Sequence, residues 1–132
     1  MIQAPLSIPN YKRLTITLGV VCAGLFLLSG YLYWTYGVLK IRVAFASEQT
    51  QIFEDMRTKA FQGDAATAAG CLQYVVWYYP SGTKQVPSSR LDRMVERERE
   101  HAVRDILSYL RTKTGEDLGE NPEAWIEKYD KR

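Results

Sequence analysis

Residues 14–39, LTITLGVVCAGLFLLSGYLYWTYGVL, contain no charged side chain and decide how the chain is organised. As a helix, the segment is roughly 39 Å long at about 1.5 Å per residue, which exceeds the ~30 Å hydrocarbon core of a bilayer. A buried helix of a globular protein seldom runs this far without a charge. The segment therefore predicts a transmembrane helix that contacts the lipid bilayer.

Aromatic residues in the last third of this segment are typical of a membrane interface, because their rings are apolar and their tips are polar. The predicted interface belt consists of Tyr31, Tyr33, Trp34 and Tyr36. Two basic residues flank the segment at each end, Lys12 and Arg13 before it and Lys40 and Arg42 after it. Because the two ends have equal numbers of basic residues, the positive-inside rule hardly distinguishes the two orientations of the helix in the membrane. The free amino group and the position of the belt favour a single-pass cell-membrane protein with its N-terminus inside and its polar part on the outer face.

A cleaved signal peptide is the main alternative, because Ala44-Phe45-Ala46 before Ser47 has the small-x-small form of a cleavage site. However, the apolar core of a signal peptide is about 7–15 residues long, and here it is much longer. We therefore expect the mature chain to keep residues 1–46. Within the segment, Gly19 and Ala23 form a small-xxx-small pair of the kind that lets two membrane helices approach closely. Small residues are common in membrane helices, so a homodimer through this pair is not favoured.

The charges exclude several classes of function. All 15 acidic residues lie after residue 39, together with every basic residue except Lys12 and Arg13, so that part of the chain is neutral. A neutral domain argues against nucleic-acid binding, which needs a basic face. With two cysteines and one histidine in 132 residues, a disulfide framework or a thiolate metal site is not expected. No catalytic, cofactor-binding or metal-binding residues are predicted, and no cofactor.

The fold class expected from the patterning is all-α, with one transmembrane helix followed by a small helical domain. The predicted parts are a tail at 1–13, the transmembrane helix at 14–39 and a soluble domain at 40–132. Apolar periodicity predicts domain helices at 41–62, 65–79, 90–113 and 122–130. Neither proline nor glycine occurs between Val38 and Gln62, so the first of these helices is expected to continue the membrane helix with little or no break.

Local signals mark the helix ends. The predicted N-caps are Asp64, Ser89 with Asp92 in a capping box, and Asn121 followed by Pro122. Gly63 and Gly115 are the predicted stops. The run ERERE at 96–100, with the histidine that follows it, is interpreted as a solvated helical face. Glu96–Arg99 and Glu100–Arg104 have the spacing of helical ion pairs, and His101 is expected to be exposed.

Part of the domain resembles the second half of a tetratricopeptide repeat. The residues that carry this resemblance are Gly63-Asp64, Ala68, Leu72 and Pro80. Tyr79-Pro80-Ser81-Gly82 looks like the repeat ends of tetratricopeptide-like envelope lipoproteins. The first half of the repeat signature is not convincing over 52–59, and one unit is present where a stable array needs at least three. The resemblance implies a helical hairpin with a protein-binding role.

The end of the chain has a second similarity and an apolar side. Thr114-Gly115, Leu118-Gly119, Pro122 and Trp125 together are similar to the ends of uncharacterised single-pass bacterial membrane proteins, a similarity that carries no known activity. Trp125, Ile126 and Tyr129 share one side of the short last helix, which we expect to pack as a lid on the aromatic end of the 65–79 helix.

Aromatic residues dominate binding hot spots, and four of them are candidates for a partner surface. They are Trp77, Tyr78, Tyr79 and Trp125. For 77–79 a place in the core is the commoner role, since a small domain needs aromatic bulk.

The resulting hypothesis is a membrane-anchored helical interaction or scaffolding protein with an unidentified protein partner. One alternative is a small membrane-associated enzyme working through carboxylates such as Asp64, Glu98 or Asp117, although neither spacing nor surroundings mark a catalytic pair. The other is an accessory subunit of a larger membrane complex.

Overall fold

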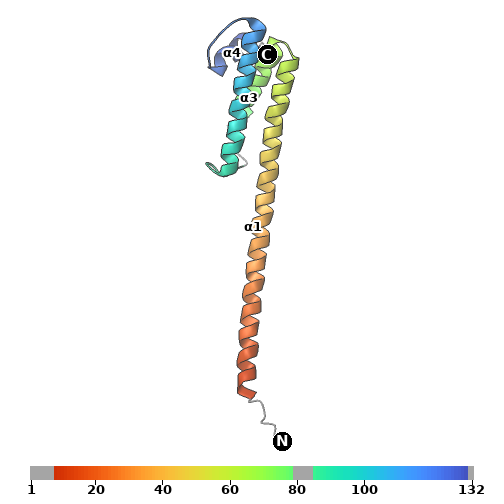
Figure 1. The fold of residues 1–132 in the computed structure, drawn as a ribbon, viewed down its shortest axis with the longest axis vertical. Helices are drawn as coiled ribbons and strands as arrows, with labels where there is room; N and C mark the ends of the chain where they lie inside the picture. Colours follow the sequence, from red (N-terminus) through yellow and green to blue (C-terminus); the bar gives the residue numbers. More distant parts are fainter. Residues whose placement is uncertain (1–7, 79–84, 131–132) are drawn as a thin grey trace. The chain divides into compact units, whose positions relative to one another are not determined.

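The computed structural model describes residues 8–78 and 85–130, and they form four helices (Figure 1). These are α1 (Ile8–Gln62), α2 (Ala65–Tyr78), α3 (Arg90–Thr114) and α4 (Pro122–Tyr129). No strand occurs in these two ranges, and the all-α class is confirmed. The part of the tetratricopeptide-like pattern at 79–82 and the predicted partner residue Tyr79 lie outside the described residues.

The chain divides into two compact units, Met1–Lys40 and Ile41–Arg132. The predicted boundary between membrane helix and soluble domain lies between residues 39 and 40, one position from this division. α1 passes from one unit to the other as a continuous helix, because no proline or glycine interrupts the sequence there. Its N-terminal part is long and apolar enough to cross a membrane.

In the N-terminal unit, the apolar side chains of 14–39 point outward along the whole helix. The leucine, phenylalanine, tyrosine and tryptophan side chains from Leu14 to Leu39 are half or more exposed. The threonine hydroxyls in this stretch donate to carbonyl oxygens of the preceding turn. The bonds are Thr15 Oγ1 to Tyr11, Thr17 Oγ1 to Arg13 and Thr35 Oγ1 to Leu32, each 2.9 Å long. The helix therefore satisfies these polar groups internally, as a bilayer requires.

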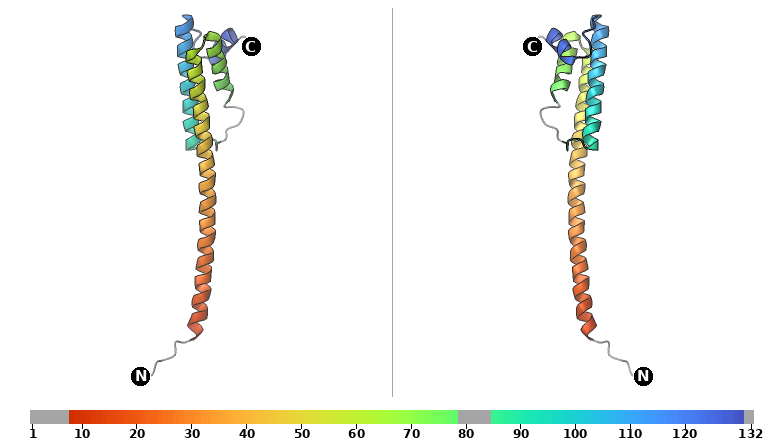
Figure 2. Two further views of the ribbon diagram at one scale, coloured as in Figure 1. Left: turned by 90° about the vertical axis from the view of Figure 1, so that its right-hand side faces the viewer. Right: turned by 90° about the vertical axis from the view of Figure 1, so that its left-hand side faces the viewer.

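In the C-terminal unit, the last part of α1 packs with the three shorter helices around one core. Figure 2 shows α3 and the part of α1 that follows residue 41 side by side. The largest fully buried side chains are Phe53 of α1, Leu72 and Val75 of α2, Val95, Ile106, Leu107 and Leu110 of α3, and Trp125 of α4. A polar contact joins the same two helices at the surface, where Arg57 Nη1 lies 2.9 Å from Asp105 Oδ2.

The turn between α1 and α2 depends on a small residue and a cap. Asp64 Oδ1 accepts the Thr67 backbone N–H at 2.8 Å, which confirms Asp64 as the N-cap. A Cβ atom added at Gly63 would lie 2.6 Å from the Thr67 side chain, so the turn excludes larger residues there. The Tyr109 hydroxyl donates to the Gly63 carbonyl at 2.7 Å and so ties this turn to α3.

The predicted caps at both ends of α3 and at the start of α4 are also confirmed. The Ser89 hydroxyl accepts the Asp92 N–H. In return, the Asp92 carboxylate accepts the Ser88 N–H at 2.9 Å, one residue earlier than in a standard capping box. Gly115 ends α3 in the left-handed conformation, with φ of 71°, and Asn121 caps α4. Ala46, the last residue of the small-x-small pattern, is buried in the domain core within α1. Cleavage after it would thus remove part of that core.

We predict that Leu72→Asp unfolds the C-terminal unit, because Leu72 is fully buried. An unpaired buried charge costs several kcal/mol, out of a total stability of about 5–15 kcal/mol for a domain of ordinary size. Circular dichroism of the full chain in detergent should show loss of cooperative melting. Ala66→Asp is the matched control, since Ala66 is exposed on the same helix and its substitution should leave the transition in place. A cooperative transition in Leu72→Asp would contradict the core assignment.

Candidate functional site

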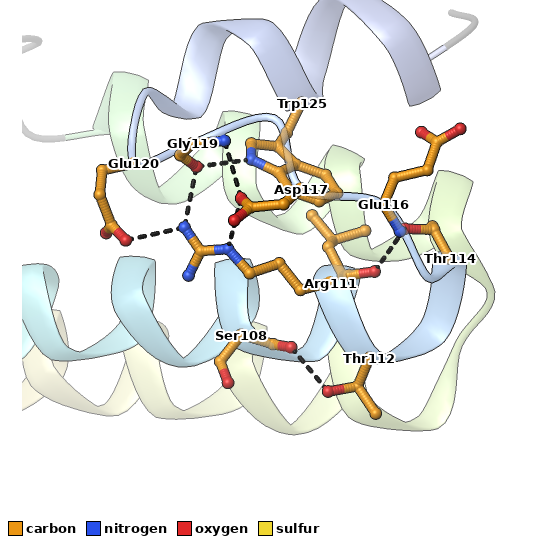
Figure 3. Close-up of polar contacts among 10 residues, drawn as sticks. Ser108, Arg111, Thr112, Thr114, Glu116, Asp117, Gly119, Glu120 and Trp125 are labelled. Carbon is orange, nitrogen blue, oxygen red and sulfur yellow. Dashed lines mark hydrogen bonds and ion pairs between the residues drawn. The ribbon is translucent and has the colours of Figure 1, made fainter.

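Arg111, in the last turns of α3, organises the segment between α3 and α4 (Figure 3). Its Nε donates to Asp117 Oδ1 at 3.0 Å, and its Nη2 donates to Glu120 Oε1 at 2.7 Å and to the Gly119 carbonyl at 3.0 Å. The Trp125 indole N–H donates to the same Gly119 carbonyl at 3.0 Å. One carbonyl oxygen thus joins the arginine on α3 to the tryptophan on α4.

A second set of hydrogen bonds joins the beginning of the segment between α3 and α4 to the end of α4. Lys128 Nζ and the Tyr129 hydroxyl both donate to Glu116 Oε2, at 2.5 and 2.6 Å. Lys128 and then Tyr129 hold the pKa of Glu116 below its ordinary value. The pKa of Asp117 is also lowered, first by the Gly119 backbone N–H and then by Arg111. These bonds hold α4 in place from both ends of the connection.

The interpretation of Trp125 as part of a partner surface is wrong. Its side chain is fully buried, and its ring lies 6.1 Å from that of Tyr129. The indole N–H is used inside the domain, so neither face nor edge is left for a partner. α4 packs against α2, as expected of a lid, but it leaves Trp77 61% exposed. The lid therefore leaves the Trp77 side chain, at the aromatic end of α2, uncovered.

The aromatic residues of α2 divide between the surface and the core. Trp77 is exposed, so the expectation of a core position is wrong for this residue. Tyr78 is half-buried and meets the Phe53 ring edge-on at 5.8 Å. Tyr74 is 45% exposed and stacks on Tyr78 at 5.4 Å. Tyr74 and Trp77 form the exposed aromatic face of α2, a name used below for these two residues.

A solvent-open groove of about 670 Å³ begins beside Tyr74. Its lining combines small residues with one cation and one carboxylate. The lining residues are Met56 and Lys59 of α1, Ala66, Thr67, Gly70, Cys71 and Tyr74 of α2, and Asp130. The small side chains of α2 create the hollow, because alanine and glycine leave the neighbouring helix surface uncovered.

The predicted interface belt lies on the surface of α1 in the N-terminal unit. Tyr31, Tyr33, Trp34 and Tyr36 are between 58% and 81% exposed. Lys40 Nζ lies 5.1 Å from the centre of the Tyr36 ring, a cation–π distance. All four rings thus lie largely exposed in the described part of the chain.

The carboxylates considered for catalysis serve structural purposes or lie apart on the surface. Asp64 caps α2, and the Thr67 backbone N–H lowers its pKa. Asp117 binds Arg111, and Glu98 is exposed on α3. A carboxylic acid that serves as a general acid needs a pKa raised toward neutrality. The pKa values of Asp64 and Asp117 are instead lowered. No group of three metal-ligating side chains occurs among the described residues, and His101 is exposed, as predicted.

Sequence reasoning identified one of the surface ion pairs and missed those that hold the tail. Glu96 and Arg99 form the predicted pair on α3. The partners of Arg111 at 117, 119 and 120 lie on an irregular segment, where no helical period predicts contacts. Arg57 and Asp105 come from different helices, so spacing along the chain contains no signal for them either.

No family model, curated protein or solved structure matches this chain.

We predict that Trp125→Ala lowers the free energy of unfolding of the C-terminal unit by about 3–5 kcal/mol, the usual cost of removing a buried large aromatic ring. Trp125→Phe should cost only about 1–2 kcal/mol, because Arg111 Nη2 still donates to the Gly119 carbonyl. Thermal melting of the full chain in detergent measures both. Equal effects of the two substitutions would show that the ring does not fill the core.

We predict that the C-terminal unit loses stability progressively as the pH falls below about 5. Asp64, Glu116 and Asp117 have lowered pKa values in the folded state, so their stabilisation is present above the ordinary carboxyl pKa and is lost as the pH falls through the folded value. Glu116→Gln should flatten the dependence of Tm on pH. Glu127→Gln, exposed on α4, is the control and should leave the slope unchanged. A Glu116→Gln slope equal to that of the natural chain would refute the assignment.

Proposed function

We propose that this chain is a single-pass membrane protein whose helical domain binds a protein partner. The observation that carries the proposal is the uncovered apolar surface of 14–39, where side chains such as Leu18, Phe26 and Leu32 are 55% or more exposed. A continuous surface of this kind requires lipid or another membrane helix, since water disfavours apolar patches of this extent. The exposed interface belt at the end of the segment supports the same role.

The second part of the proposal concerns the domain. The exposed aromatic face of α2 places Trp77 and Tyr74 at the surface, next to the groove lined by small residues of the same helix. Aromatic side chains bury much area at low entropic cost and are enriched at binding hot spots. The resemblance of Gly63-Asp64, Ala68, Leu72 and Pro80 to the second half of a tetratricopeptide repeat supports a protein-binding role by analogy.

We do not propose an enzyme. Asp64 and Asp117 have lowered pKa values and are engaged in bonds that hold the fold, which makes them poor proton donors near neutral pH. An accessory subunit of a membrane complex is a particular case of the proposal, in which the partner is itself a membrane protein. The proposed location is the cell membrane, with the N-terminus inside and the domain on the outer face.

The test combines membrane extraction with co-purification of the full chain. The protein should remain in membranes washed with alkaline carbonate, and a stoichiometric partner should accompany it in mild detergent. Trp77→Ala should lose that partner without lowering Tm, because Trp77 is 61% exposed. Arg97→Ala, exposed on α3, is the control and should retain the partner.

Two results would contradict the proposal. Release by carbonate would refute the membrane anchor. A natural chain that purifies alone from mild detergent, as a monomer, would refute the interaction role and favour the enzyme alternative.

A further inference from the structure

The connection before α3 is tied to the first residues of the C-terminal unit. The Gln85 side chain is 6% exposed, and its Nε2 donates to the Arg42 carbonyl at 2.9 Å. Both residues belong to the same compact unit. This bond holds the segment 85–89 beside Arg42, although the two are far apart in the sequence.

Arg42 lies close to the end of the apolar segment, whatever direction the domain takes from it. It is three positions after Leu39, which amounts to about 4.5 Å of helix and to no more than about 11 Å of extended chain. The polar layer on each side of a bilayer is about 5–7 Å thick, from the difference between total and hydrocarbon thickness. Given the membrane anchor of the proposed function, on which this step rests, residues 85–89 are held at or next to the headgroup layer.

The side chains at this place combine positive charge with apolar surface. Val86 is 45% exposed, and Arg42, Arg90 and Arg93 are exposed. Arg93 Nη1 donates to the Ser88 carbonyl at 2.6 Å, which draws this guanidinium toward the connection. These four residues, Arg42, Val86, Arg90 and Arg93, are called the proximal surface below.

The acidic groups near the proximal surface do not cancel its charge. Asp92 is half-buried, and its carboxylate accepts the Ser88 N–H at 2.9 Å. At the start of α3, the Ser89 hydroxyl accepts the hydrogen bond of the Asp92 N–H. The groups available to an anion are therefore the arginine side chains and not the helix end. Within Arg42 and the described residues 85–93, three guanidinium groups stand against one engaged carboxylate and leave a net positive charge.

We propose that the proximal surface binds the headgroups of anionic phospholipids. Guanidinium groups bind phosphate oxygens in pairs, and basic residues next to a membrane are attracted by its negative surface potential. Val86 lies against the boundary between headgroups and acyl chains. The interaction holds the domain against the bilayer at the start of α3.

The test uses the full chain in lipid nanodiscs, one set of phosphatidylcholine alone and one with about one part in four of phosphatidylglycerol. A fluorophore is attached at Val86→Cys in a Cys22→Ser, Cys71→Ser background, and quenching by a headgroup-spin-labelled lipid is measured. The control label is at Ser108→Cys, an exposed position about 27 Å further along α3 than its first residue at 1.5 Å per residue.

The label at 86 should be quenched more than the label at 108, and its quenching should rise in the anionic discs. Arg90→Gln with Arg93→Gln should abolish that rise while circular dichroism stays unchanged. Equal quenching at 86 and 108, no rise with anionic lipid, or an unchanged rise in the double variant would overturn the proposal. These results differ from a failure of the proposed function, which would appear earlier as a chain that does not enter the discs.

Discussion

An apolar helix surface that lies exposed in the described part of the chain is the constraint on which the rest of the structure depends. From Leu14 to Leu39 no residue carries a charge, and all but Gly37 and Val38 are exposed. The hydroxyls of Thr15, Thr17 and Thr35 donate hydrogen bonds to backbone carbonyls of their own helix. This stretch therefore offers few hydrogen-bonding groups to water. Since α1 continues without a break into the C-terminal unit, the helix whose N-terminal part is long and apolar enough to cross a membrane also supplies one wall of the domain.

Hydrogen bonds and a buried tryptophan ring hold the short last helix of this small domain in place. A helix as short as α4 is not stable alone in water, so it forms only when docked. The buried Trp125 ring supplies apolar area, and the Gly119 carbonyl shared by Trp125 and Arg111 fixes its position. Glu116 adds bonds to Lys128 and Tyr129. With the tail fastened in this way, the exposed aromatic residues Tyr74 and Trp77 remain as the surface proposed for a partner.

The two proposed binding surfaces draw on different chemistry. The aromatic face of α2 offers large rings beside a groove, which suits a protein. The proximal surface offers guanidinium groups around Val86, next to the point where the chain leaves the apolar segment, which suits anionic headgroups. Together they describe a domain held near the bilayer that presents α2 to a partner.

The sequence by itself determined the helical class, the apolar segment and most helix ends. These features depend on neighbours along the chain: the absence of charge over 14–39, the Asp64, Ser89 and Asn121 caps, and the stop at Gly115. Only the tertiary structure decided which aromatic residues are buried. Trp77 and Trp125 look alike as sequence signals, yet one is 61% exposed and the other fully buried. The difference arises because burial depends on which surface meets the side chain, and contacts such as Arg111 with Gly119 follow from packing between segments rather than from any period.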